Sequence, residues 1–126
     1  MSNPAKTVFA FGCYMFLLGL TLLLVPNLLF GLFHIAATVE VWIRVVGMLV
    51  ILLSVYYFVC ARAEIRLFML WSARVRGTVI LFFSAFVLAG LAPPALLLLG
   101  AIDFAGALWT WSALRKEASL QPAHGA

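Results

Sequence analysis

The sequence predicts an all-α membrane protein, a bundle of four transmembrane helices, and two observations carry that prediction. Hydrophobic residues make up 67% of the 126 residues and charged residues only 10%. A soluble domain carries about 25% charged residues, so this composition excludes an ordinary soluble domain, and the hydrophobicity excludes a disordered chain. The apolar residues also gather in four runs, and about 20 apolar residues let one helix cross a hydrocarbon core about 30 Å thick.

The four helices are expected over about residues 7–25, 41–61, 75–92 and 95–114. Each run must be helical, because an open strand would leave backbone groups without hydrogen bonds in lipid. The first helix should end at Pro26 and the third before Pro93 and Pro94, since proline cannot continue a helix. Together the helices form one domain over residues 1–117, followed by a flexible tail over residues 118–126.

The three connections between these helices differ in composition. The first, residues 26–39, is apolar and is expected to lie in the membrane interface. The second, residues 62–74, mixes four charged residues with apolar ones, which suits a short amphipathic interfacial segment between the second and third helices. The third is only the turn at residues 91–94, so the third and fourth helices should be antiparallel neighbours.

The distribution of lysine and arginine predicts the orientation in the membrane. With four spans, the N-terminus, the second connection and the C-terminus share one side, and only Arg44 of the 8 basic residues lies on the other. Because basic residues concentrate on the cytoplasmic side, both termini and the tail are expected in the cytoplasm. The net charge of +4 therefore reflects membrane topology, and we expect no nucleic-acid partner. The residues on the cytoplasmic side are Lys6, Arg62, Arg66, Arg74, Arg76, Arg115 and Lys116.

Asp103 is the most informative single residue, because it falls near the bilayer midplane in the fourth predicted helix. A carboxylate there costs about 2.5–3.5 kcal/mol on insertion scales, so it should face the bundle interior and find a partner. Its helical neighbours Gly100, Gly106 and Ala107 are small, which permits close helix approach. Two interpretations stay open: a proton, ion or ligand site, or a buried carboxylate that fixes how the helices dock.

Arg44 is the expected partner of Asp103, in an intramembrane salt bridge. Both lie inside the same end of the bundle, with an axial separation of about 7.5 Å, whereas Arg76 would have to reach from the opposite end of its predicted helix. Glu40 stands four residues before Arg44, a favourable spacing for a helical ion pair, so the three residues could form one polar cluster. The residues expected to line a cavity beside this cluster are Gly100, Gly106, Ala107 and Tyr57.

The remaining motifs give weaker evidence about function than Asp103 does. Pairs of small residues four apart, Ala85 with Ala89 and Ala101 with Ala105, indicate helix packing within the chain or between copies. The sequence contains no recognisable nucleophile–base pair, paired carboxylates or glycine-rich phosphate loop, so we expect no catalytic residues, no metal site and no cofactor.

Three short motifs together resemble those of small bacterial four-helix membrane proteins of the DoxX-like kind. They are Glu40-x-Trp42-Ile43-Arg44-x-x-Gly47, Arg76-Gly77, and Asp103-x-x-Gly106-Ala107-Leu108-Trp109. The resemblance implies a four-helix bundle in the bacterial inner membrane with cytoplasmic termini. Members of this group are mostly described as accessory subunits of redox systems or as trafficking and assembly helpers.

The sequence favours a non-enzymatic accessory or scaffold protein that binds another membrane protein, a second copy of itself or lipid. The alternative is a small transporter or a hydrophobic-ligand-binding protein that uses Asp103 and Arg44 as its site. A membrane enzyme or redox subunit is the least supported class, because the histidines and cysteines form no recognisable catalytic or cofactor-binding motif.

Overall fold

The computed structural model describes residues 1–32 and 35–120, and every regular element in that part of the chain is a helix. Four of the helices are long and apolar enough to cross a membrane, which confirms the predicted all-α four-helix fold. The elements are α1 (Asn3–Leu24), α2 (Pro26–Leu32), α3 (Trp42–Arg62), α4 (Arg66–Leu88) and α5 (Leu96–Leu120).

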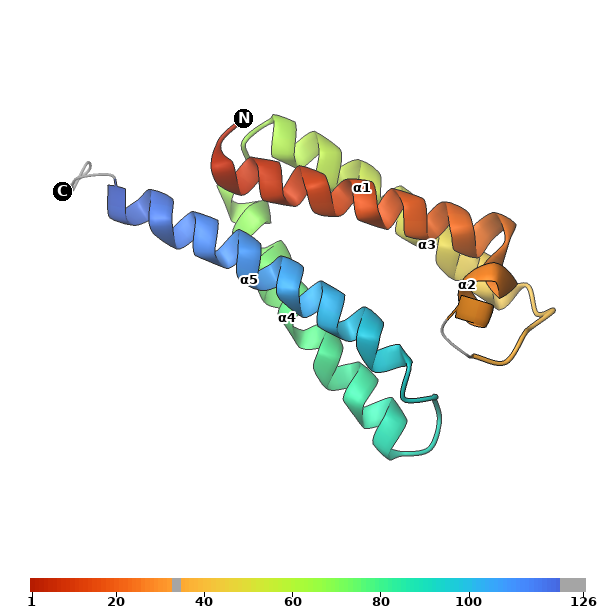
Figure 1. The fold of residues 1–126 in the computed structure, drawn as a ribbon. Coiled ribbons are helices and arrows are strands. Elements are labelled where there is room, and N and C mark those ends of the chain that lie inside the picture. The colour runs from red at the N-terminus through yellow and green to blue at the C-terminus, as the bar shows by residue number, and fades with distance from the viewer. Residues whose placement is uncertain (33–34, 121–126) are drawn as a thin grey trace.

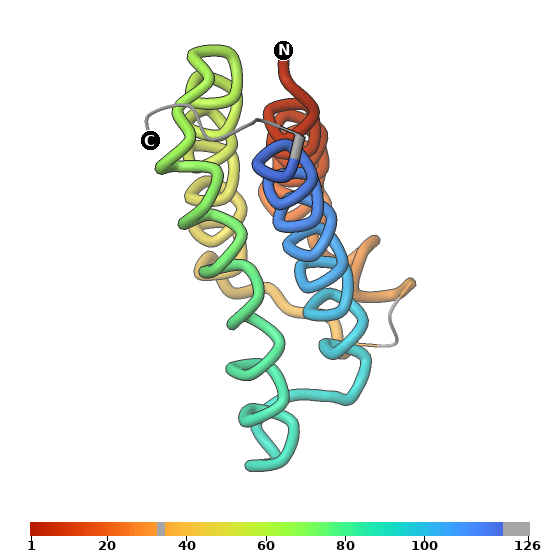
Figure 2. The backbone as a smooth tube through the Cα atoms, turned by 90° about the vertical axis from the view of Figure 1, so that its left-hand side faces the viewer, coloured from red at the N-terminus to blue at the C-terminus, as the bar shows by residue number. Residues whose placement is uncertain are grey.

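The long helices form two antiparallel pairs, α1 with α3 and α4 with α5, arranged as a V (Figure 1). The pairs meet where the N-terminus, the α3–α4 turn and the C-terminal part of α5 lie; we call this the terminal end. They diverge toward α2 and the α4–α5 turn, which we call the open end. Helix α1 also contacts α5, and Figure 2 shows these two helices side by side near the N-terminus.

The α1–α3 pair packs backbone against backbone at two glycines. A Cβ atom on Gly47 would lie 2.7 Å from the carbonyl oxygen of Gly19, and one on Gly19 would lie 2.8 Å from the carbonyl oxygen of Gly47. Real Cβ atoms do not approach so closely, so any larger residue would force the two helices apart. Small residues permit this close approach where lipid supplies no hydrophobic driving force.

The best-packed core lies near the terminal end. Its fully covered side chains include Val8 on α1, Ala61 on α3 and Met69 on α4. The rings of Phe11, Tyr57 and Phe68 extend this core, since Tyr57 lies 6.0 Å from Phe11 and 5.1 Å, edge to face, from Phe68 between ring centroids. This core therefore joins α1 to α3 and to the start of α4.

Two predicted boundaries are wrong. Helix α4 begins at Arg66, so residues 66–74 are its first turns and form no separate interfacial segment. The chain reverses instead in a tight turn at Glu64, whose φ of 57° is in the left-handed region. Helix α5 continues to Leu120, through the start of the predicted tail, and the rest of that tail lies outside the described residues.

The apolar first connection contains a short helix, α2, and a hydrogen-bonded loop. The side chain of Asn27 accepts from the backbone N–H of Thr38 at 2.8 Å and donates to its carbonyl at 3.0 Å. These two bonds tie the start of α2 to the segment that leads into α3.

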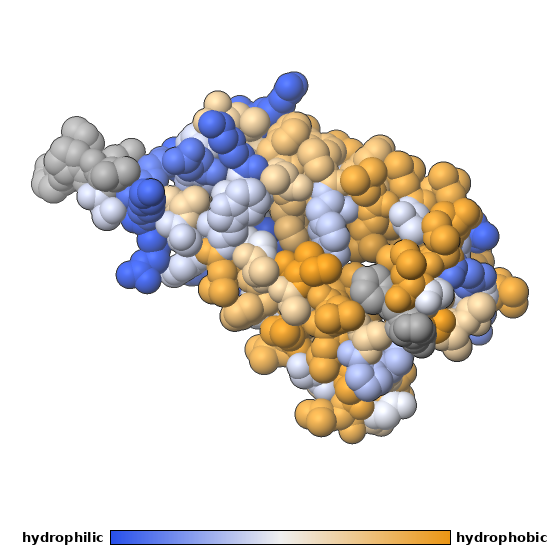
Figure 3. Space-filling model, in the orientation of Figure 1, coloured by the Kyte–Doolittle hydropathy of each residue, from blue (hydrophilic) through white to orange (hydrophobic). Residues whose placement is uncertain are grey.

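The molecular surface agrees with a transmembrane arrangement. In Figure 3, hydrophilic side chains gather mainly at the terminal end, with a smaller group at the open end, and hydrophobic side chains cover the region between. Large apolar residues stay exposed along α3, α4 and α5, as expected of lipid-facing helices.

Candidate functional site

The divergence of the helix pairs leaves an apolar cavity of about 380 Å³ between them. We call it the interhelical cavity. Among the described residues, Asp103 is its one charged lining residue, and the phenol of Tyr14 is the other polar side chain in the wall. The remaining lining residues are Leu18, Leu22, Leu29, Phe30, Ile35, Ile43, Val46, Val50, Phe83, Leu91, Ala92, Pro93, Leu96 and Leu99.

The two polar groups lie at the deep end of this cavity. Along α5, Asp103 stands seven residues from Leu96, the first residue of the helix, which is about 10 Å toward the terminal end. Tyr14 stands eight residues from Leu22 on α1, in the same direction. The α4–α5 turn and α2 supply apolar residues at the open end, so polarity increases with depth.

Asp103 and Tyr14 are both half-buried. Among the described residues, neither side chain is hydrogen-bonded to another protein group. Asp103 stands one helical turn before Gly106, which faces the Arg76 guanidinium. The Tyr14 ring lies 5.3 Å, between centroids, from the Phe11 ring that this guanidinium covers. The deep end therefore combines an acceptor, a phenol that can donate or accept, and a guanidinium close behind them.

Arg76 is the buried arginine of the bundle, with only 4% of its surface exposed. Its Nε donates to the carbonyl of Ser72 at 3.2 Å, and its Nη2 donates to the hydroxyl of Thr110 at 2.9 Å. The guanidinium carbon lies 4.2 Å from the centre of the Phe11 ring, a cation–π distance. Its Nη1 has no hydrogen-bond partner among the described residues and faces Gly106, whose Cβ would lie 3.2 Å away.

A chain of hydroxyl groups connects Arg76 to α1. The side chain of Thr7 donates to the carbonyl of Pro4 at 2.7 Å, and the Thr7 and Thr110 hydroxyls are 2.8 Å apart. Both threonines are buried. Because each hydroxyl can donate one bond and accept others, the chain satisfies polar groups that would otherwise be unpaired in the membrane.

The predicted ion pair between Arg44 and Asp103 is wrong. The exposed Arg44 instead donates from Nη1 to the carbonyls of Leu23 and Leu24 at the end of α1. Those carbonyls lack intrahelical partners, and a cation at a helix C-terminus is stabilised by the helix dipole. In the part of the chain that the structure describes, the one ion pair joins Arg66 to Glu117.

Glu40 is also outside the site. It is exposed in the loop before α3, where its backbone N–H donates to the Thr38 hydroxyl at 3.2 Å. It forms no ion pair with Arg44, because α3 begins at Trp42 and Glu40 is not within the helix. The predicted three-residue polar cluster is therefore not assembled.

None of the four residues predicted to line a cavity lines the interhelical cavity; all four lie in helix interfaces, and Gly106 also lines a shallow surface pocket between α1 and α5. A Cβ on Gly100 would touch the Phe83 ring on α4 at 3.1 Å, and one on Gly106 would touch the Phe11 ring at 2.7 Å. Ala107 and Tyr57 are buried. The small size of the three α5 residues lets α5 pack closely against its neighbours, and the flat ring of Tyr57 does the same for α3. This close packing of α5 places Asp103 beside the interhelical cavity.

Arg76 and Tyr14 are the polar residues that the sequence analysis left out of the site. A signal for Arg76 was present, because Met69, Ser72 and Ala73 share its helical face and all three are buried. This shared face can be recognised in the sequence only if α4 is taken to begin at Arg66, because a start at residue 75 leaves the three residues outside the helix. Tyr14 carried no comparable signal, since an aromatic residue inside an apolar helix is typical of lipid-facing or core positions.

A second polar network closes the terminal end. The backbone N–H and hydroxyl of Ser2 both donate to the Glu64 carboxylate, at 3.1 Å and 2.9 Å. These hydrogen bonds from Ser2 hold the pKa of Glu64 below its ordinary value. The Ser2 hydroxyl also accepts from the Ala5 N–H at 3.2 Å and so caps α1.

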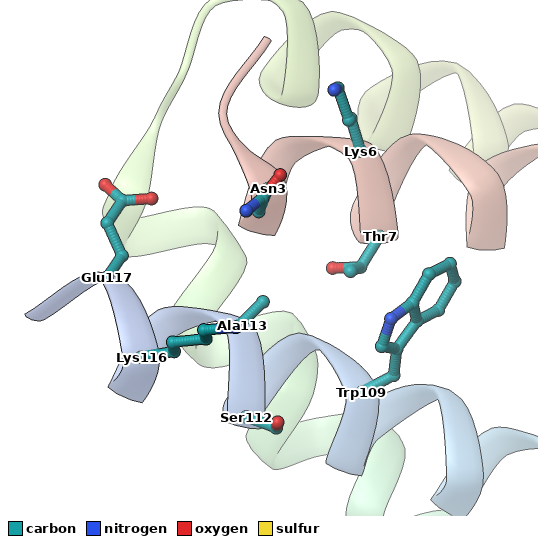
Figure 4. Close-up of a pocket in the computed structure, with 8 residues that line it drawn as sticks. All are labelled: Asn3, Lys6, Thr7, Trp109, Ser112, Ala113, Lys116 and Glu117. Atoms are coloured by element: carbon teal, nitrogen blue, oxygen red, sulfur yellow. The ribbon is translucent and has the colours of Figure 1, made fainter. Parts of the chain in front are cut away.

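A polar notch of about 340 Å³ lies between α1 and α5 at the same end (Figure 4). Lys6 extends away from α5 in this view, and Glu117 is engaged with Arg66. The notch has more polar lining residues than the interhelical cavity, but it is more open to the surface, and Lys6 and Glu117 do not converge on it, so the interhelical cavity is the better candidate site. Its lining residues are Asn3, Lys6, Thr7, Trp109, Ser112, Ala113, Lys116 and Glu117.

Comparisons of the chain with protein-family models, with curated proteins and with solved structures gave no match.

Proposed function

We propose that this protein is a non-enzymatic, multi-pass protein of the bacterial inner membrane that binds a small membrane-soluble molecule in the interhelical cavity. The observation that carries the proposal is the cavity itself: about 380 Å³ of apolar space with Asp103 at one end. Ligand sites are commonly 300–1,000 Å³, mostly apolar, with a few polar groups that set orientation. Lysine and arginine placement supports cytoplasmic termini.

The position of Asp103 supports a binding role over a docking role. A carboxylate whose task was to fix helix packing would contact a basic group directly, as Glu117 contacts Arg66. Asp103 instead lines a cavity, and the nearby arginine is engaged by Ser72, Thr110 and the Phe11 ring. Intramembrane carboxylates that face a cavity commonly mark ligand or ion sites.

A fluorescence titration tests this function. The probe is N-phenyl-1-naphthylamine, a neutral apolar molecule whose emission rises on leaving water, added to the protein in lipid nanodiscs. Leu99 lines the cavity and Leu98, its neighbour in α5, is 56% exposed. Leu99→Trp should fill the cavity and abolish saturable binding, whereas Leu98→Trp should bind like the wild type. Equal saturable binding by both variants would refute the proposal.

A role as an accessory subunit is the second candidate, and one observation favours it. Both members of the pairs Ala85/Ala89 and Ala101/Ala105 are exposed, so these pairs are not used for packing within the chain. They fit close contact with a helix of another membrane protein or of a second copy. Cysteine pairs at Ala85 and Ala101 that fail to cross-link in membranes, with a monomeric mass in nanodiscs, would argue against self-association. The resemblance to DoxX-like proteins belongs to this second candidate.

A further inference from the structure

The interhelical cavity is apolar at the open end and polar at its deep end, and this arrangement restricts which molecules can occupy it. A phospholipid that enters from the open end would keep its headgroup at the membrane surface and bring its acyl ends against Asp103 and Tyr14 at the deep end. Apolar carbon would then desolvate a carboxylate and a phenol without replacing their hydrogen bonds, which is unfavourable. The cavity therefore fits a molecule whose polar group points inward and whose apolar part points toward the open end.

The charges at the deep end restrict the polar group further. Asp103 is acidic, and the basic Arg76 is buried next to Gly106, on the neighbouring turn of α5. The deep end thus holds one acidic and one basic group, so its net charge is zero, although no ion pair joins the two among the described residues. An ammonium or carboxylate head would add an unbalanced charge to a low-dielectric site, and such a charge is costly.

A neutral hydroxyl satisfies both groups at the deep end. It can donate its proton to the Asp103 carboxylate and accept a hydrogen bond from the Tyr14 phenol, because a hydroxyl has one donor and two lone pairs. Both protein groups lack protein partners among the described residues. The bond to the carboxylate is charge-assisted and thus stronger than a bond between neutral groups.

We infer that the interhelical cavity selects a neutral, hydroxyl-headed amphiphile bound with its hydroxyl group inward, between Asp103 and Tyr14. This inference rests on the proposed function and specifies the chemistry of its ligand. The distance of about 10 Å from Asp103 to the start of α5 suits a short chain.

The test is competition by four probes of equal chain length against the naphthylamine reporter: 1-octanol, octylamine, octanoate and octane, compared at equal concentration in the nanodisc. Octanol should displace the reporter at concentrations about tenfold lower than the others, the size expected for one charge-assisted hydrogen bond. Equal displacement by octanol and octane, or stronger displacement by octylamine, would overturn the inference. Either result leaves the proposed function intact if Leu99→Trp still abolishes reporter binding.

Two variants sharpen the result. Asp103→Asn leaves the charge of Arg76 uncompensated, so the preference should change from octanol to octanoate. Tyr14→Phe removes one hydrogen bond and should weaken octanol several-fold while leaving octane unchanged, and it keeps the inference testable if Asp103→Asn fails to fold. Unaltered octanol preference in a folded Asp103→Asn variant, or in Tyr14→Phe, would contradict the assigned contacts.

Discussion

The two ends of the bundle place polar groups in opposite ways. Toward the terminal end, the α1–α3 and α4–α5 pairs meet, and the polar groups there are largely paired: the buried Arg76 with Ser72 and Thr110, and the half-buried Ser2 with Glu64. Toward the open end the pairs diverge, and the Asp103 carboxylate faces an apolar cavity. The difference indicates that one end holds the helices together, whereas the other end leaves a polar group free to bind.

The largest expected effect comes from removing the positive charge of Arg76, which is buried between the terminal end and the interhelical cavity. Arg76→Met should lower the free energy of unfolding by about 2–3 kcal/mol, because it removes hydrogen bonds from a buried charged group and leaves Asp103 uncompensated. Thermal unfolding in detergent followed by circular dichroism measures it. The double variant Arg76→Met/Asp103→Asn should recover part of the loss; strictly additive effects would show that the two charges do not interact.

Next in size is the backbone contact within the α1–α3 pair. Gly47→Ala should destabilise the protein by about 1–3 kcal/mol, since its Cβ would lie 2.7 Å from the Gly19 carbonyl oxygen. Gly77→Ala is the matched control, because a Cβ there meets only the Ala107 Cβ, at 3.9 Å. Unfolding midpoints of the two variants are compared in the same detergent, and equal midpoints would mean that the α1–α3 contact is looser than described.

A smaller effect is expected at the open end. Arg44→Gln should cost about 0.3–1 kcal/mol, the range for one exposed charge at a helix C-terminus, because it removes a cation from the carbonyls of Leu23 and Leu24. It should leave reporter affinity unchanged, since Arg44 does not contact Asp103. A loss of the octanol preference in Arg44→Gln, like the loss expected of Asp103→Asn, would restore the pairing that the sequence favoured.

The smallest effect is the pH dependence of the terminal end. Hydrogen bonds from Ser2 depress the pKa of Glu64 in the folded protein. Its contribution to stability is thus fully present above the ordinary glutamate pKa of about 4.3 and is lost as pH falls through the lower folded value. Unfolding midpoints measured between pH 7 and pH 3 should fall less in Glu64→Gln than in the wild type. An equal fall of the midpoint in both proteins would show that the hydrogen bonds from Ser2 to the Glu64 carboxylate do not contribute to stability.

Local sequence sufficed for the helices and for the inward position of Asp103. Long apolar runs leave the backbone in lipid no alternative to helix, and a carboxylate inside such a run must avoid acyl chains. The start of α4 could not be read in the same way, because Arg66 and Arg74 among apolar residues also fit a surface segment. That error moved Arg76 toward the membrane surface and hid its partnership with Thr110.

The interhelical cavity could not be predicted from the sequence, because it depends on the angle between the two helix pairs. That angle follows from contacts between residues far apart in the chain, such as Thr7 with Thr110, and from the close approach of Gly19 and Gly47. The pairing of Arg44 with Asp103 looked favourable by axial distance alone. The rotation of α3 about its own axis turns Arg44 to the exposed carbonyls at the end of α1.

The central claim, an inward-pointing hydroxyl group between Asp103 and Tyr14, is tested most directly by photo-crosslinking. An octanol analogue with a diazirine next to its hydroxyl group is bound in nanodiscs and irradiated, and labelled residues are mapped by mass spectrometry. Labels on Tyr14 and on α5 between Leu99 and Asp103, lost in Leu99→Trp, are the predicted result. Labels confined to the α4–α5 turn at Leu91 to Pro93 would contradict it, because they would place the hydroxyl group at the open end.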